Sequence, residues 1–179
     1  MALASFNLMK WVAENRHLLR PPVLNQTIFK DSDFIVQVVG GPNIRTDYHD
    51  DPYEEFFYQL KGNMVLKVGD NGNFYDVPIK EGDVFLLPPH VRHSPQRPAG
   101  SIGLVVEPKR YDSDPNDAFE WYCFECGNLV HRVEVKVEHL VRDLPPLYEA
   151  FFKDEKARTC KKCGALHPGK KPPPGWASV

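Results

Sequence analysis

The sequence predicts an antiparallel β-sandwich or β-barrel, and three observations lead to this fold class. Between residues 23 and 107, short runs that suit β-strands follow one another along the chain. Turn-forming groups such as Gly40-Gly41-Pro42 and Lys80-Glu81-Gly82 separate these runs. The length of 179 residues is enough for one well-packed domain and a small appendage. Many short strands at this spacing are typical of a sandwich or barrel.

Helices are expected at two places along the chain. The first covers Ser5–Arg20, where apolar residues follow the helical period and Pro21-Pro22 ends it. The second covers Pro145–Ala157, with apolar residues on one side. The expected strands are Gln26–Lys30, Phe34–Val39, Ile44–His49, Glu54–Leu60, Met64–Val68, Phe74–Val77, Asp83–Leu87, His93–Gln96, Ile102–Glu107, Phe119–Cys123 and Leu129–Val137.

Composition divides the chain into three segments. Residues 1–110 are expected to form the barrel, together with the N-terminal helix, and to carry the catalytic site. The polar, turn-rich stretch Lys109–Asp117 marks a boundary, so residues 111–168 are expected to form a C-terminal extension with a metal site. Residues 169–179 have the composition of a loose tail.

Charge and hydropathy limit the classes of partner. The chain has 22 Lys and Arg against 24 Asp and Glu, a formal net charge of −2, so no basic excess points to nucleic acid. No apolar run approaches the roughly 20 residues of a membrane span. The N-terminus lacks the charged and then apolar layout of a signal peptide. We therefore expect a cytoplasmic protein without membrane or nucleic-acid partners.

Two histidines and one glutamate form the strongest candidate for a reaction centre. His49 is followed six residues later by Glu55, and His93 lies in a run that starts at Gly82. Two imidazoles and a carboxylate on short strands are the set that holds a non-haem Fe(II) and leaves other coordination positions open. His90 is a competing ligand, but it follows two prolines and lies out of register with His93, so we expect a structural role for it.

Strand alternation predicts which side chains share a face with these ligands. If that face points into the barrel, two arginines lie beside the metal, and an unpaired buried charge is costly. A guanidinium binds a carboxylate bidentately, so the arginines suggest a carboxylate-bearing ligand. The alternative is that these residues have no functional role. The histidines would then be hydrogen-bonded structural residues, Glu54-Glu55 would lie on an exposed strand face, and Arg97 would be a surface charge. The residues expected on the inner face beside the ligands are Arg45, Asp47, Phe57, Pro95, Arg97 and Glu107.

The cysteines form two matching C-x-x-C-G motifs. Cys123 and Cys126 lie in the first, and Cys160 and Cys163 in the second. Such a double motif predicts one tetrahedral metal site, because each turn supplies two thiolates. Sulfur ligands suit both Zn and Fe, and we expect a structural role. The alternative, a pair of redox disulfides, is less expected in a chain without a targeting signal.

Several of these segments resemble known families. The runs His49–Gly62 and Gly82–His93 resemble the paired motifs of the cupin superfamily, whose fold is an antiparallel jelly-roll barrel, with Asp51 where the usual first motif has a second histidine. The segments G-G-P-N-I-R-T-D-Y-H, E-F-F-Y-Q-L-K-G and F-L-L-P-P-H-V-R-H-S-P-Q-R are similar to the 3-hydroxyanthranilate 3,4-dioxygenase family. This similarity runs from about Trp11 to His167, and the cysteine pairs resemble the rubredoxin-like site of the microbial form.

The resemblance implies an Fe(II)-dependent extradiol-type dioxygenase of the kynurenine pathway of tryptophan degradation. Such an enzyme, a homodimer, opens 3-hydroxyanthranilate with dioxygen to 2-amino-3-carboxymuconate semialdehyde, which closes to quinolinate, a precursor of NAD. The implied iron ligands are His49, Glu55 and His93. Arg45 and Arg97 would hold the substrate carboxylate, and Glu107 would accept a substrate proton. Further implied substrate contacts are Asn25, Val23, Val39, Phe57, Leu87 and Pro95.

Three other functions are compatible with parts of the sequence. One is a cupin enzyme acting on another small acid or sugar, such as an isomerase. Another is a metal-binding cupin module without turnover, which oxygen uptake on addition of 3-hydroxyanthranilate would distinguish. The third is a zinc-ribbon nucleic-acid binder, which would need a basic patch near the cysteines. The lysines available for such a patch are few: Lys161, Lys162, Lys170 and Lys171.

Overall fold

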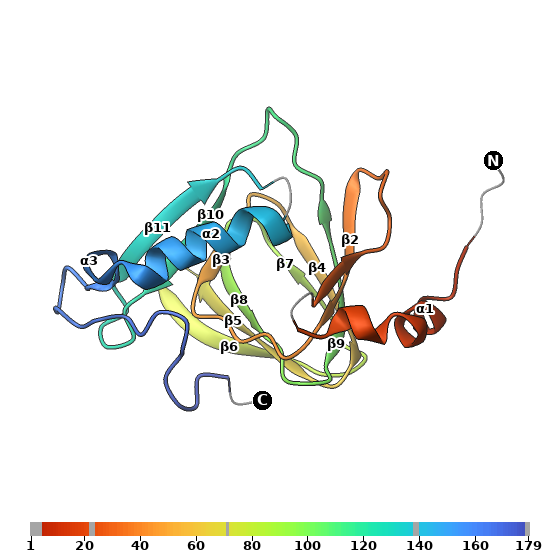
Figure 1. Ribbon diagram of the computed structural model, residues 1–179, viewed down its shortest axis with the longest axis horizontal. Helices are drawn as coiled ribbons and strands as arrows, with labels where there is room; N and C mark the ends of the chain where they lie inside the picture. The colour runs from red at the N-terminus through yellow and green to blue at the C-terminus, as the bar shows by residue number, and fades with distance from the viewer. Residues whose placement is uncertain (1–4, 22–23, 71, 138–139, 178–179) are drawn as a thin grey trace.

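The computed structural model describes residues 5–21, 24–70, 72–137 and 140–177, and it has a cupin-type fold of two antiparallel sheets (Figure 1). The predicted mostly β fold class is confirmed. The first sheet has the order β1-β2-β9-β4-β7 and the second the order β11-β10-β3-β8-β5-β6. The strands of the first sheet are β1 (Asn25–Thr27), β2 (Phe34–Gly40), β4 (Glu55–Lys61), β7 (Val84–Leu87) and β9 (Ile102–Pro108). Those of the second are β3 (Tyr48–Asp50), β5 (Met64–Asp70), β6 (Asn73–Ile79), β8 (Arg92–Gln96), β10 (Asp117–Tyr122) and β11 (Leu129–Val135).

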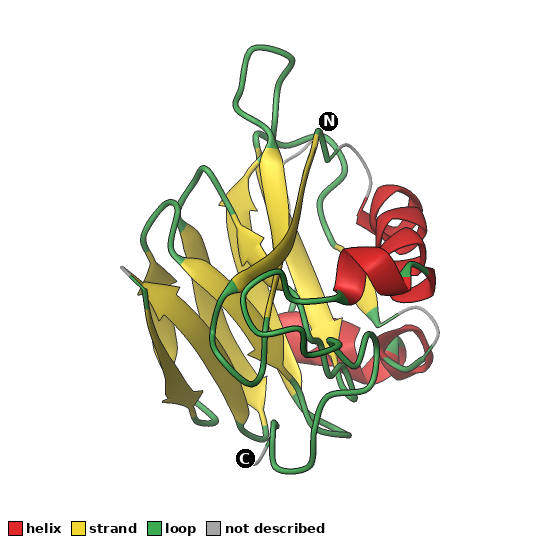
Figure 2. Ribbon diagram, turned by 90° about the vertical axis from the view of Figure 1, so that its left-hand side faces the viewer, coloured by secondary structure: helices red, strands yellow, loops and turns green. Residues whose placement is uncertain are grey.

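The helices lie together on one side of the strands (Figure 2). The predicted N-terminal helix divides into α1 (Leu8–Glu14), whose first turn is capped by the side chain of Asn7, and a 3-10 turn over Arg16–Leu19. The predicted second helix begins earlier, as α2 (Leu140–Lys153), and is followed by the short α3 (Glu155–Arg158). Among the described residues, no helix has both the length and the apolar character needed to cross a membrane.

The expected strand Ile44–His49 is wrong at its start, since β3 begins only at Tyr48. The preceding segment is held by a side chain instead of a neighbouring strand. The amide of Gln96 accepts a hydrogen bond from the backbone N–H of Arg45 and donates one to its carbonyl, both at 3.1 Å. Because this one side chain satisfies both backbone groups of Arg45, a strand ladder is not needed there.

The apolar core lies between the two sheets. Burial alternates along β4 and most of β9, so one face of each strand is buried, whereas both faces of β5 are buried. The buried members are Val39, Phe57, Met64, Leu66, Val68, Ile79, Leu87 and Val105. Three of them, Val39, Phe57 and Val105, also line the cavity that opens beside the predicted metal ligands. The core therefore ends where the candidate site begins.

The C-terminal segments pack against the barrel. Strand β10 pairs directly with β3, with Phe119 opposite His49, and Trp121 and Phe151 stack at 4.3 Å in a second apolar core. The tail also makes contacts: Thr46 donates to the carbonyl of Gly169 at 2.7 Å. The predicted division into segments at residues 110 and 168 stays a prediction, but the elements on either side of these positions share hydrogen bonds.

Candidate active site and four-cysteine centre

The three predicted ligands come together inside the barrel. His49 on β3 is directly opposite His93 on β8, and Glu55 begins β4 in the facing sheet. One potential ligand atom from each residue lies within 4.8 Å of the others, and all three residues are buried. Strand alternation correctly predicted that these side chains point to a common interior. His90 points away, with 61% of its side chain exposed and a hydrogen bond to Asp50.

The donor atoms of this group suit a cation. His93 Nδ1 lies 3.1 Å from the carbonyl of Val91, which favours the tautomer with the proton on Nδ1 and a lone pair on Nε2. Nε2 lies 2.7 Å from Glu55 Oε2, so an imidazole nitrogen and a carboxylate oxygen that can both bind a cation are adjacent. Burial opposes the charged forms of both residues, but their attraction outweighs it and raises the pKa of His93 while lowering that of Glu55. The residues present therefore fit a metal ion.

A second acidic group lies on the other side of His49. Its Nε2 is 2.8 Å from Asp117 Oδ1, and His49, Asp51 and Asp117 also lie within 4.8 Å of one another. This second set is a poorer cation site, because Arg110 already donates to Asp51 at 2.6 Å and to Asp117 at 2.9 Å. A guanidinium in that position neutralises the carboxylates and repels a metal ion. We therefore keep His49, Glu55 and His93 as the candidate ligands.

Arg110 and Asp117 belong to the site although the sequence analysis placed them in a polar boundary. Arg110 also donates to Glu107 at 2.5 Å, so one buried cation contacts three buried carboxylates. Burial alone would raise the pKa of Asp117, but the hydrogen bond from His49 and the charge of Arg110 lower it. The signal that could have found Asp117 is its parity with Phe119 and Trp121, the buried face of β10.

Arg97 lies in a different environment from Arg110. Its Nη1 donates to Gln59 Oε1 at 3.0 Å, and in the described part of the chain it forms no ion pair. Burial lowers the pKa of Arg97 to about 10, and only the more distant charge of Glu55 opposes the shift. The guanidinium fits because Gly103 faces it: a Cβ there would meet Arg97 Nη1 at 2.5 Å. A buried and unpaired guanidinium is costly unless an anion binds it.

These side chains surround a cavity of about 350 Å³. Of the predicted contacts, Asn25, Val39, Phe57, Pro95 and Glu107 line it with Arg45, Arg97 and the metal ligands. Leu87 is buried in the adjoining core and is not part of the lining, while Val23 lies outside the described residues. The sequence analysis missed the lining residues contributed by other segments, which are Leu24, Leu144, Pro145, Tyr148, Phe152 and Lys170.

Glu107 is a buried carboxyl group of the cavity that is paired with Arg110. Burial raises its pKa well above the usual range, and the charges of Glu55 and Asp51 add to this effect while Arg110 opposes it. Asn25 Oδ1, another lining atom, is buried and has no hydrogen-bond partner among the described residues. Both groups can therefore interact with a polar ligand in the cavity.

Comparison with known proteins decides the family. The model of the 3-hydroxyanthranilic acid dioxygenase family matches residues 1–152. The chain belongs to this family. A protein of Ruegeria pomeroyi named 3-hydroxyanthranilate 3,4-dioxygenase is 66% identical over 178 residues, which cover 99% of this chain and 98% of that protein. A protein of the same name from Brucella anthropi is 65% identical over 180 residues, with the same coverage. The family predicted from the sequence motifs is confirmed.

Solved structures similar to this member of the dioxygenase family have low sequence identity to it. A cupin-2 domain containing protein from Shewanella frigidimarina has a TM-score of 0.43 and 16% identity, covering 54% of this chain and 90% of that chain. The hydroquinone 1,2-dioxygenase PnpCD has a TM-score of 0.49 and 23% identity, covering 62% of this chain and 34% of that one.

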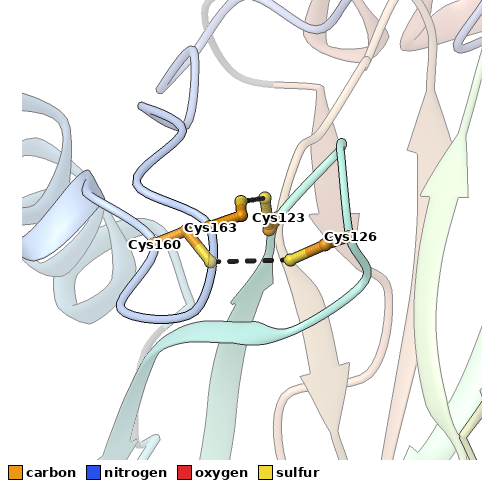
Figure 3. Close-up of side chains that lie close together, drawn as sticks. All are labelled: Cys123, Cys126, Cys160 and Cys163. Carbon is orange, nitrogen blue, oxygen red and sulfur yellow. Dashed lines mark hydrogen bonds between the residues drawn. The ribbon is translucent and has the colours of Figure 1, made fainter.

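The four cysteines of this family member converge as the motifs predicted (Figure 3). All four are free, and their sulfur atoms lie within 4.8 Å of one another. The Cys123–Cys163 and Cys126–Cys160 sulfurs are 3.6 Å apart. Metal–sulfur bonds of about 2.3 Å in a tetrahedron place sulfurs roughly 3.8 Å apart, so the arrangement fits one metal ion. Cys160 and Cys163 lie beyond the residues matched by the family model.

Proposed function

We propose that the cavity binds 3-hydroxyanthranilate and that the protein opens its ring with dioxygen at an Fe(II) held by His49, Glu55 and His93. The product would be 2-amino-3-carboxymuconate semialdehyde, which contains both oxygen atoms of O₂, so the reaction needs no external reductant. Family membership supports this proposal. The observation that carries it is Arg97, whose buried guanidinium lies in the same cavity as the ligand group and has no carboxylate partner among the described residues.

The arginines would bind the substrate through its carboxylate. A guanidinium offers parallel N–H donors that match the two oxygens of a carboxylate, and such charge-assisted bonds are strong when buried. Arg97 gains a counter-ion on binding, which removes the cost of its isolated charge. Arg45 is already paired with Asp47, so its positive charge is largely neutralised. Its contribution would be N–H donors that orient the substrate carboxylate.

Other residues would orient the ring and take up its proton. Val39, Phe57 and Pro95 form an apolar wall, and α2 covers the cavity with Leu144 and Phe152, which excludes water from the reacting atoms. Glu107 would accept the proton that the substrate hydroxyl loses, because its pKa lies well above that of an ordinary carboxyl group. When bound, the ferrous ion would supply open coordination positions and would pass electrons from the substrate, which is oxidised, to dioxygen, which is reduced.

The four-cysteine centre is proposed to hold Zn or Fe in a structural role. Two of its ligands, Cys123 and Cys160, belong to the second apolar core beside Trp121 and Phe151. A metal there would fasten α3 and the β10–β11 hairpin together. The expected homodimer and the cytoplasmic location stay predictions.

The proposed function is tested by stoichiometric oxygen uptake. Purified protein is loaded with Fe(II) without air and then given 3-hydroxyanthranilate and oxygen, and the product is identified by mass. We expect one O₂ consumed per substrate. His93→Asn should lose iron affinity by more than about 100-fold, because a direct ligand matters more than its neighbours. The matched control His90→Asn, at an exposed site, should keep both iron and activity.

Two results would contradict the proposal. If iron is bound but no oxygen is consumed, the chain is a binding module or acts on another substrate. If His93→Asn binds iron as tightly as the unchanged protein, the ligand set is wrong.

A further inference from the structure

Helix α2 brings one hydroxyl group to the arginines of the cavity. Tyr148, in the middle of this helix, is partly buried, and its hydroxyl bonds to both members of the Arg45–Asp47 ion pair. Arg45 Nη2 donates to Tyr148 Oη at 3.0 Å, and Tyr148 Oη lies 3.1 Å from Asp47 Oδ2, where it donates. The helix belongs to the C-terminal part of the chain, whereas Arg45 precedes β3 in the barrel.

Arg45 needs such a partner because its backbone is not part of a strand. Its long side chain has many rotamers, and ordering it costs about 2 kcal/mol of conformational entropy. Asp47 takes Nε at 3.3 Å and also Nη2, and Tyr148 fixes the same Nη2 from a second direction. Among the hydrogen bonds of the described residues, Nη1 takes part in none, which leaves it for a ligand in the cavity that Arg45 lines.

The ring of Tyr148 is itself held in place. It makes edge-to-face contacts with Phe119 at 5.7 Å and with Trp121 at 5.8 Å, both on the buried face of β10. One turn along α2, Phe151 packs in the same apolar core as Cys123 and Cys160. The hydroxyl is therefore supported by a rigid surface that the four-cysteine centre completes.

We propose that Tyr148 is a positioning residue for substrate recognition: it holds the Arg45 guanidinium so that Nη1 faces the substrate carboxylate. This inference rests on the proposed function, since it assumes a carboxylate at the arginines. It assigns the C-terminal helix a direct part in specificity for carboxylated aminophenols. A purely structural Tyr148 would support the fold but would not distinguish substrates with and without the carboxylate.

The test compares two ligands that differ only in the carboxylate. Anaerobic titrations of the iron-loaded protein measure the dissociation constants for 3-hydroxyanthranilate and for 2-aminophenol. Tyr148→Phe keeps the ring and removes one hydrogen bond to a charged group, so both Kd and KM for the carboxylated ligand should rise about 10-fold, with little change in kcat. The Kd for 2-aminophenol should not change. Tyr75→Phe, on β6 with a half-exposed ring, is the matched control.

A double-mutant cycle adds a readout that a structural role would not move. If Tyr148 acts through Arg45, then Tyr148→Phe should cause no further loss of 3-hydroxyanthranilate binding in an Arg45→Gln background. Additive losses would overturn the inference, as would equal weakening of both ligands or an unchanged Kd in Tyr148→Phe. If Tyr148→Phe does not fold, Asp47→Asn, which removes the other anchor of Arg45, should show the same ligand selectivity. If the unchanged protein binds neither ligand and consumes no oxygen, the proposed function itself fails.

Discussion

Two buried arginines beside the candidate metal site differ in what the chain provides for their charge. Arg110 is bonded to Asp51, Glu107 and Asp117, whereas in the described part of the chain the guanidinium of Arg97 donates only to the neutral amide of Gln59. Burial lowers the pKa of both, but the three carboxylates reverse the effect and raise that of Arg110, while that of Arg97 falls to about 10. The charge of Arg110 is neutralised within the protein, so Arg110 has a structural role at the site. The uncompensated charge is available to a ligand.

The largest effect is expected on stability when Arg110 is replaced by Met. Three buried carboxylates would then lose their common cation, and breaking a buried ion pair from one side costs about 3–5 kcal/mol. The measurement is the free energy of unfolding in urea at neutral pH for the iron-free protein. A loss below about 1 kcal/mol would show that the ion pairs of Arg110 do not stabilise the fold, and the proposed difference between Arg110 and Arg97 would be wrong.

Arg97→Met should have the opposite pattern. Removal of an unpaired buried charge leaves the free energy of unfolding unchanged or raises it by about 1 kcal/mol. The lost contact with the substrate carboxylate should lower kcat/KM for 3-hydroxyanthranilate by roughly 100-fold, since a buried charged contact contributes about 2–4 kcal/mol. Bound iron should not change. Normal kinetics in this variant would remove Arg97 from the substrate site, and a large loss of stability would mean that its charge has a partner in the fold.

The sequence predicted the strands well and their ends less well. Alternation and turn residues locate β4 and β9, because most of their buried residues repeat every second position, whereas β5 is buried on both faces. The start of β3 was wrong because the side chain of Gln96 satisfies the backbone of Arg45, which no local pattern records. The expected start of the second helix at Pro145 was wrong, because α2 begins at Leu140 and contains Pro145 and Pro146 in its interior.

The candidate site was likewise predicted in part from the sequence. Its metal ligands and arginines lie in strand-like runs, where parity predicted that they would meet. Asp117 meets His49 from β10, where its parity with Phe119 and Trp121 was the available signal. Tyr148 could not be predicted in this way, because it lies on a helix and meets Arg45 across 103 residues of sequence. Trp176 is similar: it lies in the expected loose tail, yet its indole N–H donates to the carbonyl of Arg45 at 2.8 Å. Local patterns define faces of strands, and tertiary packing decides which distant side chains complete them.

His167 is a third buried group, and only one of its two ring nitrogens has a hydrogen-bond partner among the described residues. Its Nδ1 accepts a hydrogen bond from the N–H of Gly169 at 3.1 Å, while Nε2 is buried without a partner among the described residues. Burial, with the charge of Arg158, lowers the pKa of His167 to about 4. The neutral form is therefore the folded form, and its contribution is complete above the unfolded pKa of about 6.5 and is lost as the pH falls toward 4.

Replacing His167 with Asn should remove this pH dependence, because the Asn side-chain oxygen can accept the Gly169 hydrogen bond without titrating. We expect the unfolding free energy of the unchanged protein to fall by about 1–2 kcal/mol more than that of His167→Asn between pH 7.5 and pH 5. Denaturant titrations of both proteins with the cysteine centre metal-loaded measure the difference, so metal loss affects each alike. Parallel pH profiles would mean that water reaches His167 and that its imidazolium is solvated. In that case, burying a polar group without a partner would cost less free energy in this protein than its packing indicates. The contrast between Arg97 and Arg110 depends on the same cost.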